Sequence, residues 1–189
     1  MENFIDEETF DSEVFTKKNL KRGIYEICTF VQCDFTNIDL AEYVFIDCEF
    51  DDCNLSNTNI NTTVLQNVSF KNCKLIGLQF DTCNKQGLQL SFTDCQLSNA
   101  IFYELDAKII NMKSCDLTEA DFTYCNLAGV VFDECNFQGA LFENTNLEKA
   151  DFRTAINYSI NPELNKIKKA KFSVHGLQGL LNKYDIVIE

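Results

Sequence analysis

The hydrophobic residues of this chain recur every five positions. In the stretch from Cys115 to Arg153, Leu or Phe stands at every fifth residue, in the order Leu117, Phe122, Leu127, Phe132, Phe137, Phe142, Leu147 and Phe152. The residue two places before each of them is Cys, Ala, Val or Thr, and the other positions are mostly polar. A helix repeats at 3.6 residues and a strand at 2, so neither element would bury this set on one face.

A solenoid with one pentad on each side accounts for the period. The Leu or Phe at the centre of the pentad (position i) and the small residue at i−2 point inward, and the next two residues turn a corner. Four sides then close a coil of 20 residues, and successive coils pair through their backbones at a spacing of about 4.8 Å. The pattern therefore predicts an all-β, four-sided β-helix of roughly seven coils, about 34 Å long.

The phase of the repeat divides the chain into three parts. Residues 1–24 are predicted to be an N-terminal cap or an imperfect first coil, because Glu8, Glu13 and Lys18 occupy inward i−2 positions. Residues 25–172 form the β-helix, with a break near 83–91 where two extra residues shift the frame. We expect a bulge or loop there, with Gly87 supplying the unusual backbone and the small centre Ala107 leaving room one coil later. Residues 173–189 are predicted to be a short helix capped by Ser173, a dimerisation segment and a final strand at 185–189.

All ten Cys residues occupy the i−2 position, where a small apolar side chain is needed. They are Cys28, Cys33, Cys48, Cys53, Cys73, Cys83, Cys95, Cys115, Cys125 and Cys135. The repeated C-x4-C spacing is the pentad itself and differs from the C-x2-C spacing typical of zinc sites. We expect reduced thiols buried in the core, with no metal and no cofactor.

The triplets Ala120-Asp121-Phe122 and Ala150-Asp151-Phe152 resemble the A(D/N)LXX motif of the pentapeptide-repeat family, whose fold is a right-handed quadrilateral β-helix. The tail, with Asn157-Tyr158-Ser159-Ile160-Asn161-Pro162 and Gly179-Leu180-Leu181, resembles the C-terminal segment of the Qnr and MfpA group. That resemblance implies a homodimer joined through the C-terminus, which mimics duplex DNA and binds DNA gyrase or topoisomerase IV. Typical Qnr proteins carry two projecting loops that this frame does not accommodate, so the rod is more similar to MfpA.

The net charge of −13 lies on the coil. Residues 25–155 contain 20 Asp or Glu and 7 Lys or Arg, whereas residues 156–189 contain 3 and 5. Binding to nucleic acid is therefore disfavoured, and a partner with a basic groove is favoured. The candidate partner-binding carboxylates, at i−1 or i+2, are Asp34, Asp39, Glu42, Asp47, Glu49, Asp52, Asp94, Glu104, Asp116, Asp121 and Glu134. The candidate dimer interface is Val174, Leu177, Leu180, Leu181 and Tyr184.

The sequence does not favour an enzyme. His175 is the single His and falls in the C-terminal cap, and no P-loop, dinucleotide fingerprint or H-E-x-x-H motif occurs. No apolar run reaches 18 residues, and the acidic N-terminus lacks the features of a signal peptide, so we expect a cytoplasmic protein that does not enter a membrane. Two functions stay open: a DNA-mimicking rod that binds a type II topoisomerase, with quinolone resistance as a further consequence of that binding, and a structural or interaction scaffold with another partner.

Overall fold

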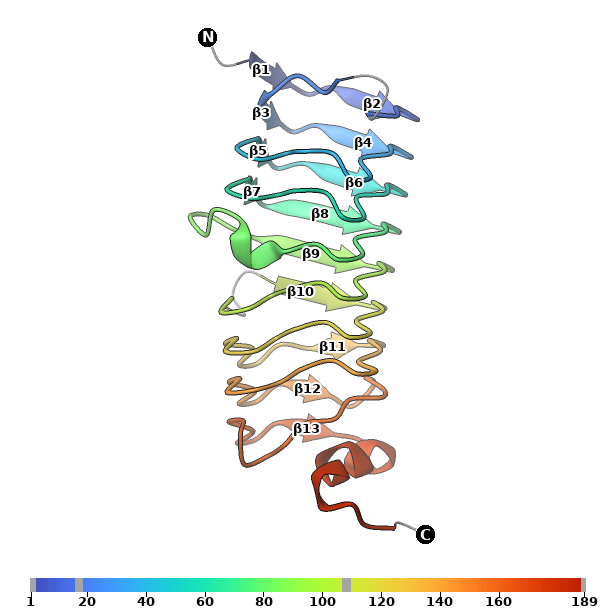
Figure 1. The fold of residues 1–189 in the computed structure, drawn as a ribbon, viewed down its shortest axis with the longest axis vertical. Coiled ribbons are helices and arrows are strands. Elements are labelled where there is room, and N and C mark those ends of the chain that lie inside the picture. The colour runs from blue at the N-terminus through green and yellow to red at the C-terminus, as the bar shows by residue number, and fades with distance from the viewer. Residues whose placement is uncertain (1–2, 16–18, 107–109, 188–189) are drawn as a thin grey trace.

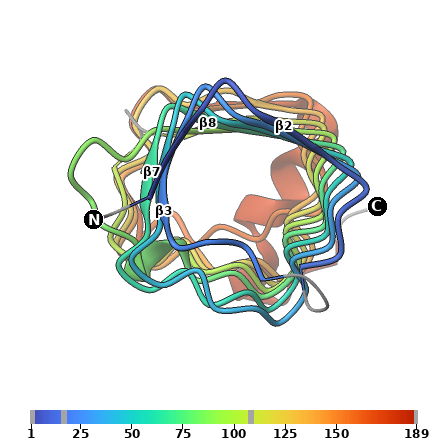
Figure 2. The same ribbon diagram turned by 90° about the horizontal axis from the view of Figure 1, so that it is seen from above.

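The chain folds into a four-sided β-solenoid of about eight turns, which confirms the expected fold class (Figure 1). The computed structural model describes residues 3–15, 19–106 and 110–187. The expectation of roughly seven coils is too low, because β1 (Asn3–Asp6) and β2 (Thr9–Asp11) already pair with the following turn in its register of 20 residues. Seen along its axis, the backbone traces one outline that is repeated turn after turn (Figure 2).

The strands lie on two sides of the solenoid, and all pair in parallel. One side holds β1, β3 (Gly23–Glu26), β5 (Val44–Ile46) and β7 (Val64–Gln66). The next side holds β2, β4 (Thr29–Val31), β6 (Glu49–Asp51), β8 (Val68–Lys71), β9 (Leu90–Thr93), β10 (Ile110–Lys113) and β11 (Phe132–Asp133). A separate pair, β12 (Asp151–Phe152) and β13 (Lys171–Phe172), lies below β11 (Figure 1).

We number the four sides in chain order by the residues at their pentad centres. Side 1 contains Ile5, Tyr25, Phe45, Leu65, Leu127 and Leu147, and side 2 contains Phe10, Phe30, Phe50, Phe70, Phe92, Met112, Phe132, Phe152 and Phe172. Side 3 contains Phe15, Phe35, Leu55, Leu75, Leu97, Leu117 and Phe137, and side 4 contains Leu20, Leu40, Ile60, Phe80, Phe102, Phe122 and Phe142.

The centres of each side stack directly over one another in the core. On side 2, the ring centroids of Phe30 and Phe50 are 4.7 Å apart and those of Phe50 and Phe70 are 5.1 Å apart. The pattern's central expectation, a column of stacked Phe rings, is therefore confirmed. Each buried Phe contributes on the order of 1.5–3 kcal/mol through burial.

The i−2 positions do more than supply small side chains. All ten Cys are buried, and many donate from Sγ to a backbone carbonyl 23 residues earlier, as Cys53 does to Phe30 O at 3.3 Å. Thr63 and Thr145 make the same bond from Oγ1 to Leu40 O and Phe122 O, both at 2.8 Å. Where Cys or Thr fills this position, its side chain therefore also satisfies a backbone carbonyl of the previous turn.

The corners depend on two local devices. The residue at i+2 has a positive φ, as at Asn37 (57°) and Asp94 (55°), and Asn, Asp and Gly tolerate that conformation best. The Asp or Asn at i−1 accepts a hydrogen bond from the backbone N–H two residues later, as Asp121 does from Thr123 at 2.8 Å. The polar residues of the motif thus build the turn that the buried residues require.

The register changes between Asn84 and Leu90. Asn84 pairs with Val64, 20 residues earlier, whereas Leu90 pairs with Val68, 22 residues earlier. The backbone here forms a short 3-10 helix, η1 (Phe80–Thr82), followed by an exposed corner in which Gly87 has a φ of 74°. This corner projects beside β9 (Figure 1). Lys85 is exposed, and Ala107 lies outside the described residues.

A C-terminal cap covers the last turn (Figure 2). It consists of two 3-10 helices, η3 (Val174–Leu180) and η4 (Asn182–Tyr184), and Ser173 Oγ accepts a hydrogen bond from Gly176 N at the start of η3. The expected strand at 185–189 is wrong for the described residues Asp185–Val187, which form no strand. Asp185 has a φ of 50° and ends η4 in the left-handed region, which turns the chain away from extended backbone.

Candidate interaction surfaces

The candidate carboxylates lie around the rod rather than on one face. Asp34 and Asp116 belong to side 3, Asp39 and Asp121 to side 4, and Glu49 to side 2. The other candidates occupy three corners: Asp47 follows side 1; Asp52, Asp94 and Glu134 follow side 2; Glu42 and Glu104 follow side 4. The position of each carboxylate within its pentad follows from the sequence, but its assignment to a side of the solenoid requires the strand register.

Several i−1 carboxylates accept hydrogen bonds that stabilise the turn that follows them. Asp34 Oδ1 accepts from Thr36 N at 2.9 Å, and Asp39 Oδ1 accepts from Ala41 N at 2.9 Å. Asp116 Oδ1 accepts from Thr118 Oγ1 at 2.6 Å and from Asn136 Nδ2 at 3.2 Å. These side chains carry negative charge, but their replacement by residues other than Asn would also disturb a turn.

The corner carboxylates at i+2 are exposed and separated by neutral donors. Between sides 2 and 3, acids stand at Asp52, Asp94 and Glu134, and Asn72 and Ser114 fill the intervening turns. Gln32 donates to Asp52 at 3.2 Å, and Ser114 donates to Glu134 at 3.0 Å. Carboxylates stacked on adjacent turns would repel at about 4.8 Å, so alternation reduces that repulsion while it keeps a line of negative charge.

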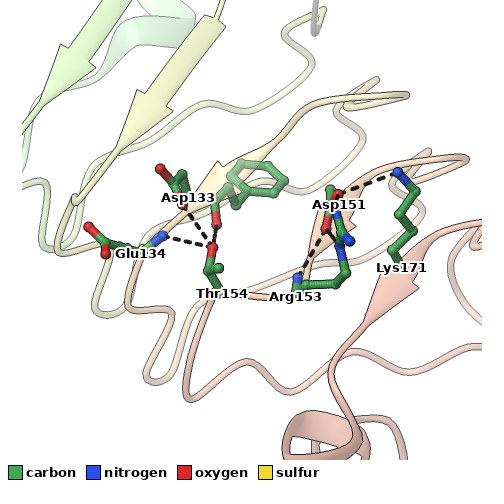
Figure 3. Close-up of polar contacts among 7 residues, drawn as sticks. Asp133, Glu134, Asp151, Arg153, Thr154 and Lys171 are labelled. Atoms are coloured by element: carbon green, nitrogen blue, oxygen red, sulfur yellow. Dashed lines mark hydrogen bonds and ion pairs between the residues drawn. The ribbon is translucent and has the colours of Figure 1, made fainter.

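Basic residues neutralise the C-terminal end of side 2 (Figure 3). Arg153 Nη2 lies 2.8 Å from Asp151 Oδ2, and Lys171 Nζ lies 3.5 Å from the same oxygen. The hydrogen bond from Arg153 lowers the pKa of Asp151 to about 2. Thr154 Oγ1 lies between Asp133 Oδ1, at 3.1 Å, and Glu134 N, also at 3.1 Å. Here the negative charge is matched locally by positive charge.

Side 4 has a different surface in the C-terminal half of the rod. Ile101, Asp121 and Leu141 stack on successive turns at i−1, and the rings of Tyr103 and Tyr124 meet edge to face at 5.6 Å. Tyr124 and Leu141 are 53 % and 51 % exposed. Asp121 was among the candidate carboxylates, but no pattern rule used in the sequence analysis singled out Ile101, Tyr103, Tyr124 or Leu141, because they occupy outward positions of an otherwise regular repeat.

The five candidate dimer residues separate into two groups. Val174, Leu177 and Tyr184 are exposed, at 81 %, 45 % and 54 %, whereas Leu180 packs against the core and Leu181 is half-buried. The α-helical stripe does not form as one face, because η3 and η4 are 3-10 helices with three residues per turn. Gly176 and Gly179 allow the cap to dock, since a Cβ on either would lie about 2 Å from Tyr158 atoms.

The described part of the chain offers no arrangement of three or more His, Cys, Asp or Glu suited to a metal ion. His175 is exposed on η3. Burial raises the pKa of the Cys48, Cys83 and Cys125 thiols to about 12. Among the helices of the described residues, none is both long enough and apolar enough to cross a bilayer.

A family model described as "Pentapeptide repeat region" matches residues 24–91 and 88–161, which is most of the chain. The chain belongs to the pentapeptide repeat family. Its two matched segments meet at the register change, as expected if an interruption separates two uniform runs of pentads. No curated protein matches the chain.

The solved structure of QnrB1 resembles the whole rod. Full-length QnrB1, a plasmid-mediated fluoroquinolone resistance protein, superposes with a TM-score of 0.56 at 15 % identity, covering 97 % of this chain and 100 % of QnrB1. A trypsin-treated QnrB1 variant gives 0.54 at 17 % identity, with 100 % of both chains covered. HetL, a pentapeptide repeat protein involved in heterocyst differentiation regulation from the cyanobacterium Nostoc, gives 0.42 at 11 % identity, covering 90 % of this chain and 87 % of HetL. At these identities the likeness to QnrB1 shows a shared fold.

Proposed function

We propose that this pentapeptide repeat protein is a non-enzymatic acidic rod that mimics duplex DNA and binds a type II topoisomerase, DNA gyrase or topoisomerase IV. The observation that carries the proposal is the line of exposed corner carboxylates Asp52, Asp94 and Glu134, which runs along the rod at every second turn. The fold likeness to QnrB1, a fluoroquinolone resistance protein, supports it.

The net charge of the rod can be compared with the charge of duplex DNA of the same length. Eight turns at about 4.8 Å give a rod of roughly 38 Å, and duplex DNA of that length carries roughly 22 phosphate charges. The net charge of −13 is therefore more than half that of the DNA it would replace. Attraction between exposed charges weakens as salt rises, so binding should be salt-dependent.

The C-terminal cap supplies the second part of the proposal, a two-fold dimer. Val174, Leu177 and Tyr184 are exposed at this end of the rod and are available to a partner. A two-fold interface is the usual arrangement of homo-oligomers. Two rods joined at these ends would span roughly 77 Å at the same rise per turn, with the acidic coils outward.

The decisive experiment measures DNA supercoiling by gyrase with increasing protein, in the presence and absence of ciprofloxacin. We expect the wild-type protein to inhibit supercoiling, and protection from the drug would extend the function to quinolone resistance. The triple variant Asp52→Asn, Asp94→Asn, Glu134→Gln removes three corner charges and keeps residues that suit the turn. The control Glu7→Gln, Glu26→Gln, Glu148→Gln removes three charges elsewhere.

The outcomes separate the two functions left open by the sequence. Loss of inhibition in the corner variant but not in the control supports DNA mimicry. Deletion of residues 173–189 should give monomers and abolish the effect. A full-length protein that stays monomeric at high concentration contradicts the dimer. No effect on gyrase or topoisomerase IV at any salt concentration leaves the alternative, an interaction scaffold with another partner.

A further inference from the structure

A mixed aromatic and acidic stripe runs along side 4 in the C-terminal half of the rod. We define the side-4 stripe as Ile101, Tyr103, Glu104, Asp121, Tyr124 and Leu141. These residues are contiguous: Asp121 pairs with both Ile101 and Leu141, and the tyrosine rings are 5.6 Å apart. The stripe lies across the rod from the corner at which Asp52, Asp94 and Glu134 line up.

The charge of this surface is of one sign. Positions 79–82, 101–104, 121–124 and 141–144 contain Asp81, Glu104, Asp121 and Glu143 and no Lys or Arg. Lys85, at the following corner, lies close enough to act on Asp81, but burial still raises the pKa of Asp81. One oxygen of that carboxylate, Oδ1, is buried without a hydrogen-bond partner. Side 4 thus contrasts with side 2, where Arg153 and Lys171 neutralise Asp151.

Tyr124 occupies a position that disfavours it. It stands at i+2 with a φ of 59°, where most other turns have Asn, Asp, Glu, Ser or Gly. A bulky residue in the left-handed region costs stability, and its ring is 53 % exposed, so burial does not offset that cost. On the same corner the neighbouring turns carry Glu104 and Asn144, which shows what the repeat accepts without a Tyr.

The stripe continues toward the cap as a hollow of about 400 Å³. Leu141, Glu143 and Leu164 line it on the coil, and Asn182 and Lys183 line it on the cap. Lys183 is paired with Glu163 at 2.5 Å, so its charge is already matched. Leu164 is 50 % exposed. A partner that follows side 4 therefore meets aromatic and apolar surface bordered by carboxylates over several turns.

We propose that the side-4 stripe binds arginine side chains presented by a basic protein partner, independently of the corner line formed by Asp52, Asp94 and Glu134. Arginine fits this chemistry because its planar guanidinium stacks on aromatic rings and pairs with carboxylates, and Tyr is enriched at the energetic centres of interfaces. A second copy of this chain fits poorly, since its own carboxylates would face those of the first. The proposal concerns a surface distinct from the line of DNA-mimicking charge.

The test compares binding of hexa-arginine and hexa-lysine peptides to three proteins by calorimetry. The stripe variant Tyr103→Thr, Tyr124→Asn removes both rings and no charge, and its new residues occur in the same columns at Thr123 and Asn144. The corner triple variant described above removes three charges and no ring. We expect the stripe variant to weaken hexa-arginine binding at least about five-fold, in line with two lost cation–π contacts.

Selectivity decides the outcome. The wild-type protein should prefer hexa-arginine to hexa-lysine, the stripe variant should lose that preference, and the corner triple variant should retain it. Hexa-arginine binding by the stripe variant within two-fold of wild type overturns the proposal. If the stripe variant unfolds at a lower temperature, Glu104→Gln with Asp121→Asn provides a second test, because Asn can still accept from Thr123 N.

Repeating the comparison with purified gyrase separates this proposal from the proposed function. If gyrase binds and only the corner variant weakens it, the stripe has no part in that complex, and the peptide result alone decides the stripe. If gyrase does not bind and hexa-arginine binding still depends on the two Tyr residues, DNA mimicry of topoisomerase fails and the stripe stands. Binding of neither gyrase nor hexa-arginine refutes both.

Discussion

The two halves of the rod, on either side of the register change at Asn84–Leu90, have the same interior and different exteriors. Both are filled by stacked Phe and Leu with Cys or another small residue at i−2. Outside, the first half exposes few large apolar side chains, Phe4 and Ile27, whereas the second exposes Tyr124, Val131, Leu141, Ile156 and Leu164 before the cap begins. The pentad constrains two inward positions in five, so the outward positions are where the halves can acquire different roles.

The ways in which the halves handle charge also differ. In both halves carboxylates meet amides on neighbouring turns, as Asn59 Nδ2 donates to Asp39 at 2.8 Å in the first half and Asn136 Nδ2 to Asp116 at 3.2 Å in the second. In the second half, side 2 adds ion pairs from Lys113 to Asp133 and from Arg153 to Asp151, while side 4 has carboxylates and aromatic rings with no Lys or Arg at positions 101–104, 121–124 and 141–144. A uniform fold thus carries at least two kinds of surface. Measurements on matched variants can test whether the cores of the two halves are equally stable.

The largest effect is expected from removing a core ring in each half. Phe50→Ala and Phe132→Ala should each lower the free energy of unfolding by about 3–5 kcal/mol, because a fully buried ring is lost and a cavity remains. Both rings are at most 1 % exposed and stack on ring neighbours at about 5 Å. Urea unfolding measures the cost. A cost below about 1 kcal/mol for either variant would show that the register of that half is wrong.

A smaller effect, confined to the second half, is expected at the cap. A Cβ at Gly179 would lie 2.1 Å from Tyr158 O, a backbone atom that cannot move aside cheaply. Gly179→Ala should therefore destabilise docking of the cap by about 2–3 kcal/mol, a typical cost of overpacking. The readout is hydrogen exchange at Ile160 N–H, which donates to Gly179 O at 2.9 Å.

The matched control for the cap is Gly129→Ala. A Cβ there meets nothing within 4 Å, but its φ of 78° alone should cost about 1 kcal/mol. This variant should leave exchange at Ile160 close to wild type. Equal acceleration of exchange by both variants would mean that the effect comes from general loss of stability rather than from the contact between Gly179 and Tyr158.

The interior was accessible from the sequence because its signal is periodic. Phe30, Phe50 and Phe70 could be placed in one column by counting 20 residues, and their rings stack in that order. The shift near Gly87 could be located because two residues were left over between Phe80 and Phe92. The number of turns was underestimated because Glu8 and Glu13 at i−2 suggested a cap. The strands on either side of Glu8 nevertheless pair with the next turn in the regular register, so the end of the solenoid accepts these carboxylates.

The exterior could be predicted only in part. The phase of each carboxylate followed from the pentad, but which acids share a side depends on the register shift and on how side chains pair across turns. Tyr103 and Tyr124 gave no periodic signal, since a single aromatic residue at an outward position fits the pattern as well as a polar one. The two rings, which meet at 5.6 Å, become conspicuous once Ile101, Asp121 and Leu141 are seen to stack on the same side of the rod.

The smallest effect concerns Asp151, whose ion pairs distinguish side 2 of the second half from the amide ladders of the first. The hydrogen bond from Arg153 holds the folded pKa at about 2, below the ordinary value of 3.8. A depressed carboxyl pKa contributes stability that is fully present above the unfolded pKa and is lost as pH falls through the folded pKa. The relevant window is therefore between about pH 4 and pH 2. Because Arg153 is largely exposed to solvent, which screens the pair, we expect a contribution of about 1 kcal/mol rather than the full value of the shift.

Two variants isolate that contribution in urea unfolding at pH 7 and at about pH 2.5. Asp151→Asn keeps an oxygen that can accept from Arg153 N, as Asp151 does at 3.2 Å, but removes the titrating group. Arg153→Gln keeps the carboxyl and removes its main partner. Both should be less stable than wild type at pH 7 by about 1 kcal/mol and closer to it at about pH 2.5, because the wild-type protein loses the ion pair as Asp151 takes up its proton. A difference from wild type that stays constant with pH would mean that the bonds of Asp151 to the turn, rather than its charge, hold this end of side 2 together.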